Sequence, residues 1–227
     1  MNDIKKNIEN VRNRIKNAAD CNGRDSTSIS LLAVTKTKPT SMIRQAFDAG
    51  CKSFGENYLQ DALPKIHEMR NLDIDWHYIG KLQSNKTADI ARNFDWVHSL
   101  DQFKHAEKLS SHRINFSKPL QCCLQINLTG EASKGGIPLD SVSKLAKKIK
   151  ALPNLNLRGL MTIPDPQQTE DQQLHTFIQL AKLKDDLNRE SLNLDVLSIG
   201  MSRDLDLAIR AGSTIVRIGT DIFGARD

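Results

Sequence analysis

The stretch Leu31-Leu32-Ala33-Val34-Thr35-Lys36 decides the fold, because four consecutive apolar residues lead directly to a threonine and a lysine. Consecutive apolar residues are typical of a strand that is buried on both faces, as in a parallel sheet. We therefore predict a strand over Ser30–Thr35. Parallel strands need a crossover connection, which is usually a helix, and a helical pattern follows at Ser41–Ala49. The first unit of the chain is thus a strand followed by a helix.

The same unit recurs to the end of the sequence. The further β-rich runs that we predict as strands are Lys52–Gly55, Trp76–Gly80, Trp96–Ser99, Leu120–Leu128, Leu157–Thr162, Val196–Gly200 and Thr214–Gly219. Helical patterns lie between them at Asn57–Arg70, Lys86–Asn93, Gln102–Ser111, Leu139–Leu152, Thr169–Asn188 and Asp204–Ala211. This alternation predicts an α/β protein, a single (β/α)₈ TIM barrel. The alternative is an open Rossmann-like sheet, but the G-x-G-x-x-G motif is absent after the first strand.

The segment before the first strand, residues 1–20, is predicted to be an extra helix that packs on the barrel. Its apolar residues recur at helical spacing, at Ile4, Ile8, Val11 and Ile15. Because it carries both signs of charge and no apolar core, it does not resemble a targeting peptide. The chain has 227 residues, within the range of one barrel, so we predict a single domain over 1–227. No segment approaches the roughly 20 apolar residues that cross a membrane.

Charge and cysteine content favour an ordinary globular protein of the cytoplasm. The formal net charge is +5, from 32 basic and 27 acidic residues, and this excess is too small to indicate nucleic-acid binding. The lysines of Ser143–Lys150 could form a basic surface, but that stretch has the apolar face of a barrel helix. The cysteines have no metal-ligand spacing and are predicted to be reduced. Cys122 and Cys123 are adjacent on a predicted strand, so they should face opposite sides.

Functional residues of an α/β barrel gather at the carboxyl ends of its strands. The sequence places Lys36 after the first strand, Ser202 after the seventh, and Arg217, Gly219 and Thr220 at the end of the eighth. Barrel phosphate sites commonly use the loops after strands seven and eight. We expect hydroxyls and backbone N–H groups of these loops to bind a phosphate. An amine, a cation and a phosphate site would then converge on a ligand about the size of pyridoxal 5′-phosphate (PLP).

Two further loops are predicted at this end of the barrel. Thr129–Pro138 is rich in glycine and lysine and reads as a long loop after the fifth strand. Pro164 and Pro166 mark the loop after the sixth strand. Both loops should border the mouth of the barrel.

Each candidate residue also has a simpler explanation. Lys36 could be a solvated surface lysine, and Ser202 could only cap the helix predicted at Asp204–Ala211. Arg217 could pair with an acidic residue such as Asp221 or Glu56. His77 lies in a Trp-His-Tyr run, where a hydrogen-bonded core histidine is the ordinary expectation.

Six blocks of sequence carry a resemblance to a known family. They are Leu32–Pro39, Phe54–Tyr58, Trp76–Lys86, Gly159–Thr162, Ser198–Ser202 and Val216–Gly224. In this order, and over nearly the whole chain, they resemble the pyridoxal-phosphate homeostasis proteins, the YggS-like family. The departures from the family pattern are small: Thr35 stands where serine is commoner, Ile199 where methionine is usual, and Arg203 where an acidic residue is frequent.

The resemblance implies a fold-type III PLP barrel, related to the N-terminal domain of alanine racemases. It implies that Lys36 forms a covalent aldimine with PLP and that Arg217 faces the pyridine nitrogen. It assigns phosphate binding to Ser202, Gly219 and Thr220. It places three further residues around the cofactor, namely Asn57, His77 and Met201.

The same residues favour a PLP carrier over an enzyme. A guanidinium facing the ring nitrogen disfavours a second positive charge there, which weakens the cofactor as an electron sink. Racemases of this fold add a tyrosine base from a C-terminal domain, whereas this sequence ends at Asp227 and has only Tyr58 and Tyr78. We expect a cytoplasmic monomer that buffers PLP and delivers it to apo-enzymes, without robust turnover. The alternative is a PLP-dependent amino-acid racemase.

Overall fold

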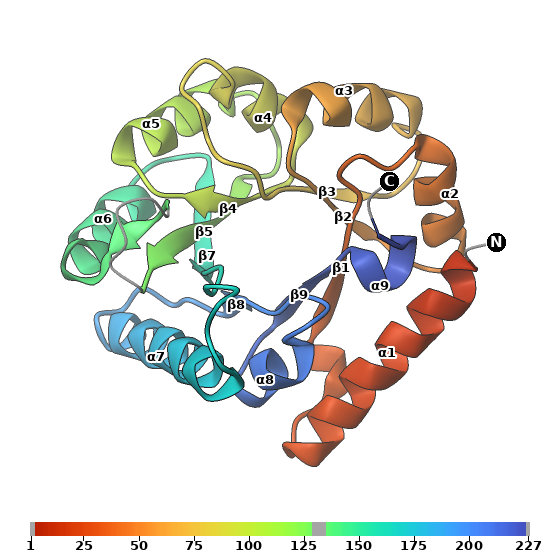
Figure 1. Cartoon of the computed structure of the whole chain (residues 1–227). Helices are drawn as coiled ribbons and strands as arrows, with labels where there is room; N and C mark the ends of the chain where they lie inside the picture. The colour runs from red at the N-terminus through yellow and green to blue at the C-terminus, as the bar shows by residue number, and fades with distance from the viewer. Residues whose placement is uncertain (1–2, 129–134, 226–227) are drawn as a thin grey trace.

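The computed structural model describes residues 3–128 and 135–225 and forms a closed barrel of parallel strands surrounded by helices (Figure 1). The barrel strands are β1 (Ser30–Val34), β2 (Ser53–Glu56), β3 (Asp75–Tyr78), β4 (Trp96–Leu100), β5 (Leu120–Asn127), β7 (Leu155–Met161), β8 (Val196–Ser198) and β9 (Ile215–Ile218). Each pairs with its neighbours in parallel, and the β4–β5 and β1–β9 pairings close the ring. The predicted (β/α)₈ barrel is confirmed, and the open-sheet alternative is wrong.

Helices return the chain between successive strands. They are α2 (Thr40–Asp48), α3 (Leu59–Glu68), α4 (Thr87–Asn93), α5 (Phe103–His112), α6 (Val142–Lys150), α7 (Glu170–Arg189) and α8 (Leu205–Arg210), with short 3₁₀ turns at η1 (Ser26–Ser28) and η2 (Leu139–Ser141). Helix α7 begins with a capping box, in which Thr169 and Gln172 exchange side-chain and backbone hydrogen bonds. Among the described helices, none is long and apolar enough to cross a membrane.

The predicted extra helix at the N-terminus is α1 (Ile4–Cys21). The side chain of Asp3 caps it by accepting a hydrogen bond from the backbone N–H of Lys6. Its apolar face is buried against α2, α8 and the short helix α9 (Thr220–Phe223), so α1 covers the outside of the barrel beside β1 and β9 (Figure 1). This placement brings α1 close to the loops that follow β8 and β9.

The core has two parts, one between the strands and helices and one inside the barrel. Strand residues alternate between them, since successive side chains point to opposite faces. Cys122 belongs to the outer core and Cys123 to the inner cluster, as predicted, and both are free thiols. The inner cluster consists of Leu32, Cys123, Met161, Val196 and Ile215.

Two short elements were not predicted. Strand β6 (Ile137–Pro138) pairs with β5 at its carboxyl end, inside the region predicted as the loop Thr129–Pro138; residues 129–134 of that loop lie outside the described residues. Helix α9 follows β9 directly. A two-residue strand and a four-residue helix are too short to carry a recognisable hydrophobic period.

Candidate functional site

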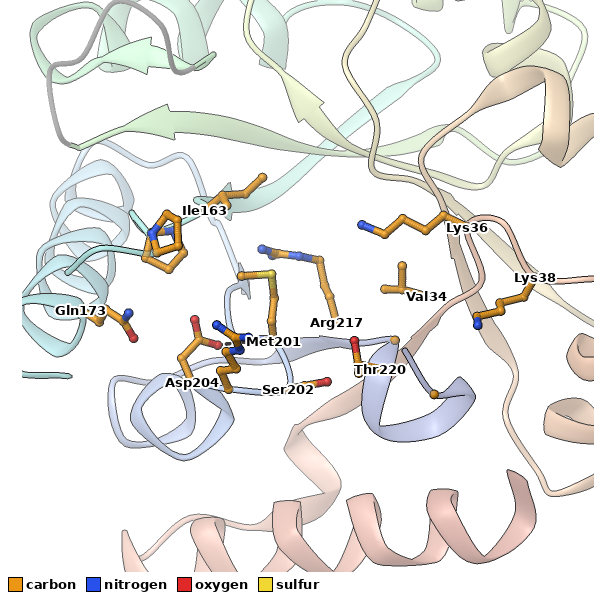
Figure 2. Close-up of a pocket in the computed structure, with 15 residues that line it drawn as sticks. Val34, Lys36, Lys38, Ile163, Gln173, Met201, Ser202, Asp204, Arg217 and Thr220 are labelled. Atoms are coloured by element: carbon orange, nitrogen blue, oxygen red, sulfur yellow. Dashed lines mark hydrogen bonds between the residues drawn. The ribbon is translucent and has the colours of Figure 1, made fainter. Parts of the chain in front are cut away.

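A pocket of about 400 Å³ lies at the carboxyl ends of β1, β7, β8 and β9 (Figure 2). That volume suits a small-molecule ligand. Six of the eight predicted site residues line it, namely Lys36, Met201, Ser202, Arg217, Gly219 and Thr220. The other described lining residues, which the site prediction did not include, are Val34, Lys38, Ile163, Pro164, Pro166, Gln173, Arg203, Asp204 and Gly224.

Lys36 enters the pocket from the end of β1. A turn follows it, in which the N–H of Lys38 donates to the carbonyl of Thr35 at 3.0 Å and Thr37 adopts a left-handed φ of 64°. Figure 2 shows the half-buried Lys36 side chain extending toward the centre of the pocket. Lys38 is directed to the C-terminal segment instead, where its Nζ donates to the carbonyl of Ala225 at 3.0 Å.

A buried ion pair holds the backbone just before Lys36. Glu56, at the end of β2, accepts hydrogen bonds from Thr35 Oγ1 and Lys65 Nζ, both at 2.7 Å. Lys65 Nζ also donates to the carbonyl of Thr35 at 3.0 Å, so it fixes the peptide that joins Thr35 to Lys36. Burial raises the pKa of Glu56, and the charge of Lys65 opposes that rise. The sequence prediction missed this pair, because Lys65 lies on a helix with no local signal of burial.

Ser202, Gly219 and Thr220, which we call the hydroxyl rim, line one side of the pocket. Figure 2 shows the Ser202 and Thr220 hydroxyls on this same side. The backbone N–H of Asp221 donates to Ser202 Oγ at 3.4 Å and so ties the loop after β8 to the start of α9. Gly219 is half-buried, and a Cβ there would lie only 3.3 Å from the carbonyl oxygen of Val34, so its backbone packs closely against the end of β1. Hydroxyls beside backbone at a helix start are typical of phosphate sites.

Ser202 does not cap helix α8, as the simpler explanation required. Asp204 precedes that helix, and its Oδ1 accepts a hydrogen bond from the backbone N–H of Met201 at 2.5 Å. Asp204 is buried, which raises the pKa of its carboxyl group. This hydrogen bond closes the turn that contains Met201 and Ser202. The sequence analysis did not predict it.

Arg217 forms the floor of the pocket and is only 5% exposed. Its Nη1 donates to the carbonyl and, at 2.9 Å, to the hydroxyl of Ser198, and its Nη2 donates to the carbonyl of Thr162 at 3.0 Å. The acids suggested as alternative partners are engaged elsewhere, Glu56 with Lys65 and Asp221 with Arg14. Burial lowers the pKa of Arg217 to about 10, which still leaves it cationic at neutral pH.

The two remaining predicted residues, Asn57 and His77, do not line this pocket. His77 is buried inside the barrel, stacked on Trp96 with ring centroids 5.3 Å apart, and burial lowers its pKa to about 3. Its Nδ1 lies 2.8 Å from His98 Nε2. Asn57 follows β2, and its carbonyl oxygen would be 1.9 Å from a Cβ on Gly80. Within the described residues, Asn57 Oδ1 and His77 Nε2 have no hydrogen-bond partner, and their contact with a cofactor stays a prediction.

The fold and the pocket together define an α/β barrel that places a lysine, a buried arginine and the hydroxyl rim around one pocket. The family model for the alanine racemase N-terminal domain matches residues 1–227. The pyridoxal phosphate homeostasis proteins of Pseudomonas aeruginosa and Escherichia coli K12 are 51% and 46% identical, over all of this chain and 97% and 98% of theirs. The chain therefore belongs to the family of pyridoxal phosphate homeostasis proteins.

Solved structures agree with this assignment. PipY of Synechococcus elongatus, in a structure with PLP bound, is 34% identical with a TM-score of 0.83, over 92% of this chain and 100% of that one. Alanine racemase from Corynebacterium glutamicum has a TM-score of 0.72 at 15% identity, over 98% of this chain and 61% of the racemase. The second likeness shows the shared barrel alone. The family resemblance expected from the sequence is confirmed.

Proposed function

We propose that this protein binds PLP in the pocket, holds it covalently through Lys36 and serves intracellular PLP homeostasis. The observation that carries the proposal is the convergence of Lys36 from β1 and Arg217 from β9 on one pocket with a hydroxyl rim (Figure 2). The name shared by the relatives and the PLP bound in the PipY structure support it. PLP supplies an aldehyde that condenses with amines, and the protein supplies binding and orientation.

The pocket residues fit the parts of PLP. Ser202, Gly219 and Thr220 would bind the phosphate, and Arg217 would face the ring nitrogen. Of the five N–H donors of Arg217, three are used by Ser198 and Thr162, and the described residues offer no acceptor for the other two. A buried cation at the pocket floor therefore retains donors for a ligand. Met201 lines the same pocket and would also contact the cofactor. We propose that Asn57 and His77 lie around the cofactor as well.

We also propose that the protein carries PLP and has no robust catalytic turnover. Arg217 stays cationic at neutral pH although burial lowers its pKa to about 10, and a cation disfavours protonation of a nitrogen that faces it. Among the described residues that line the pocket there is no tyrosine or histidine to act as a second base opposite Lys36. Asp204, the one described acid there, is already bonded to the Met201 N–H. Such a site suits retention and release of PLP more than chemistry at an amino-acid α-carbon.

In this proposal residues 1–227 act as one domain, as a cytoplasmic monomer, and apo-enzymes that depend on PLP are the acceptors.

The proposed function is tested by two measurements on PLP-loaded protein. Activation of an apo-enzyme should be faster than spontaneous PLP dissociation allows, because PLP that is transferred in a direct encounter does not have to be released into solution first. Exchange of the α-proton of amino acids into solvent should stay at the rate of free PLP. Rapid exchange that disappears in Lys36→Ala would overturn the carrier role and favour a racemase.

A further inference from the structure

A chain of buried polar side chains crosses the interior of the barrel beneath the pocket. Arg217 Nη1 lies 2.9 Å from Ser198 Oγ, Ser198 Oγ lies 2.7 Å from His98 Nδ1, and His98 Nε2 lies 2.8 Å from His77 Nδ1. Each of the four residues is at most 5% exposed. Four strands, β9, β8, β4 and β3, thus contribute one polar group each to a single line of hydrogen bonds.

The alternation of strand residues explains why these groups meet. Val196 and Ile215 belong to the inner cluster, and Ser198 and Arg217 follow each of them by two residues on the same face. His98 likewise follows Trp96, which packs against that cluster. The polar line therefore forms the layer of the barrel interior directly above its apolar layer, on the pocket side.

The direction of the hydrogen bonds follows from their donors. A guanidinium only donates, so Ser198 Oγ must accept from Arg217. If the Ser198 hydroxyl then donates to His98 Nδ1, His98 carries its proton on Nε2 and donates to His77 Nδ1. This direction leaves one proton unpaired among the described residues, on His77 Nε2. The reverse direction leaves two groups unpaired, the Ser198 hydroxyl proton and the His77 Nε2 lone pair, and is costlier because both are buried.

We propose that Ser198, His98 and His77 form a hydrogen-bond relay of fixed direction that positions Arg217 for the ligand above it. The relay rests on the proposed function only for the identity of that ligand. Both histidines must be neutral for it to work. Burial lowers the pKa of each, and the neighbouring Arg217 and His77 lower that of His98 further. Since both Nη1 protons of Arg217 are taken by Ser198, the relay leaves Nε and one Nη2 proton for the ligand.

The first experiment needs no ligand. In the ¹⁵N-histidine-labelled protein, long-range ¹H–¹⁵N spectra report which ring nitrogen carries the proton; His77→Gln and His98→Gln assign the signals. We expect His77 and His98 to be neutral Nε2–H tautomers at neutral pH. In Ser198→Ala the hydroxyl is gone, so each direction of the hydrogen bonds leaves two buried groups unpaired, one at His98 Nδ1 and one at His77 Nε2. The Nδ1–H and Nε2–H tautomers of both histidines should then coexist. An Nδ1–H tautomer of His98 in the wild-type protein would overturn the relay.

The second experiment compares Ser198→Ala with Ser213→Ala. Ser213 is also fully buried, but its hydroxyl donates to the carbonyl of Ile199 outside the relay. Loss of a hydrogen bond to a charged group should raise the Kd for PLP about tenfold in Ser198→Ala, with an equal rise for pyridoxal, which lacks the phosphate. The Kd of Ser213→Ala should stay within about twofold of the wild-type value.

Equal effects of the two substitutions would overturn the relay, since a merely structural role predicts no difference. If the wild-type protein failed to bind PLP, the proposed function would be wrong. The tautomers of the ligand-free protein would still decide the relay, so the two failures are distinguishable.

Discussion

Lys36 and Lys38 stand two residues apart and have different surroundings. Lys36 follows a peptide that is fixed by the buried Glu56–Lys65 pair, and its side chain extends into the pocket. Lys38 is half-buried and bonded to the carbonyl of Ala225. The fixed backbone at Thr35 sets the point from which the Lys36 side chain starts, and that side chain extends toward the centre of the pocket (Figure 2). Because of this difference, the covalent link to PLP is expected at Lys36 and not at Lys38.

The hydroxyl rim can be tested by removing the Ser202 hydroxyl. Ser202→Ala should raise the Kd for PLP about tenfold, because a hydrogen bond to a charged phosphate is lost. The Kd for pyridoxal should not change, since pyridoxal has no phosphate. Absorbance titration with both ligands measures this. An equal loss for the two ligands would place the phosphate elsewhere.

The buried pair beneath Lys36 predicts a pH-dependent stability. In Lys65→Met the charge that opposes the rise in the pKa of Glu56 is gone, so its folded pKa rises further above the unfolded value. Such a carboxyl destabilises the fold once the pH exceeds the unfolded pKa, and the penalty grows as the pH rises toward the folded pKa. We expect the unfolding free energy of Lys65→Met to be about 3 kcal/mol lower than that of the wild-type protein at neutral pH. This difference should become smaller below about pH 4, where Glu56 is protonated in the unfolded chain as well.

Denaturant titrations at several pH values measure that loss. Lys16→Met is the matched control, because Lys16 forms an exposed pair with Asp20, and exposed pairs contribute little. A loss in Lys65→Met that is the same at acidic and neutral pH would contradict the role given to Glu56.

At the scale of elements, the turn between β8 and α8 positions the rim. Gly200 has φ +97°, and a Cβ there would lie 2.6 Å from the Cβ of Ala208 on α8. The turn can therefore approach α8 only with glycine. From the other side, α1 reaches the same turn, since Arg14 Nη1 donates to the carbonyl of Ser202 at 2.7 Å. Arg14 also pairs with Asp206 on α8 and Asp221 on α9.

Gly200→Ala should destabilise the protein more than Gly212→Ala does. Gly212 has a similar φ of +100°, but a Cβ added there would lie no closer than 3.8 Å to any neighbour, the nearest being Leu197 Cδ1. Gly212→Ala should cost about 1 kcal/mol for the backbone alone, and Gly200→Ala about 2 kcal/mol more for the clash with α8. Unfolding free energies from denaturant titration give the comparison. Equal costs would mean that the turn does not depend on contact with α8.

The extra helix should affect PLP retention through one arginine. Arg14→Gln removes the bond to Ser202, so PLP should dissociate about three- to tenfold faster. Arg12→Gln is the matched control on the same helix, since Arg12 donates to the carbonyls of Ala49 and Gly50, which do not line the pocket. Stopped-flow capture of released PLP measures both rates. Identical rates in the two variants would contradict a link between α1 and the rim.

At the scale of the whole molecule, the sequence was sufficient to predict the barrel and the strand ends that bear the site. Every predicted barrel strand is present, with ends that differ by one or two residues, as at Trp76–Gly80 against β3 Asp75–Tyr78. The barrel follows from apolar runs and helices that alternate locally. Lys36, Ser202, Arg217 and Gly219 were predicted to lie together because functional residues gather at the carboxyl ends of barrel strands, and they line one pocket.

The contacts that position those residues could not be predicted, because they join distant segments. His98 and Ser198 are 100 residues apart in sequence, and Arg14 and Ser202 are 188 apart. Such pairs meet only when the β4–β5 and β1–β9 pairings close the barrel. A single sequence shows each residue at its own strand or helix, but not the register that brings two of them within hydrogen-bonding distance.

The most direct test of the account is to find which lysine holds PLP. PLP-loaded protein is reduced with borohydride, digested, and mapped by mass spectrometry, with Lys36→Ala and Lys38→Ala treated in parallel. We predict the phosphopyridoxyl mass on Lys36 in the wild-type protein and in Lys38→Ala, and none in Lys36→Ala. Labelling of a different lysine in the wild-type protein, or undiminished labelling in Lys36→Ala, would contradict the account.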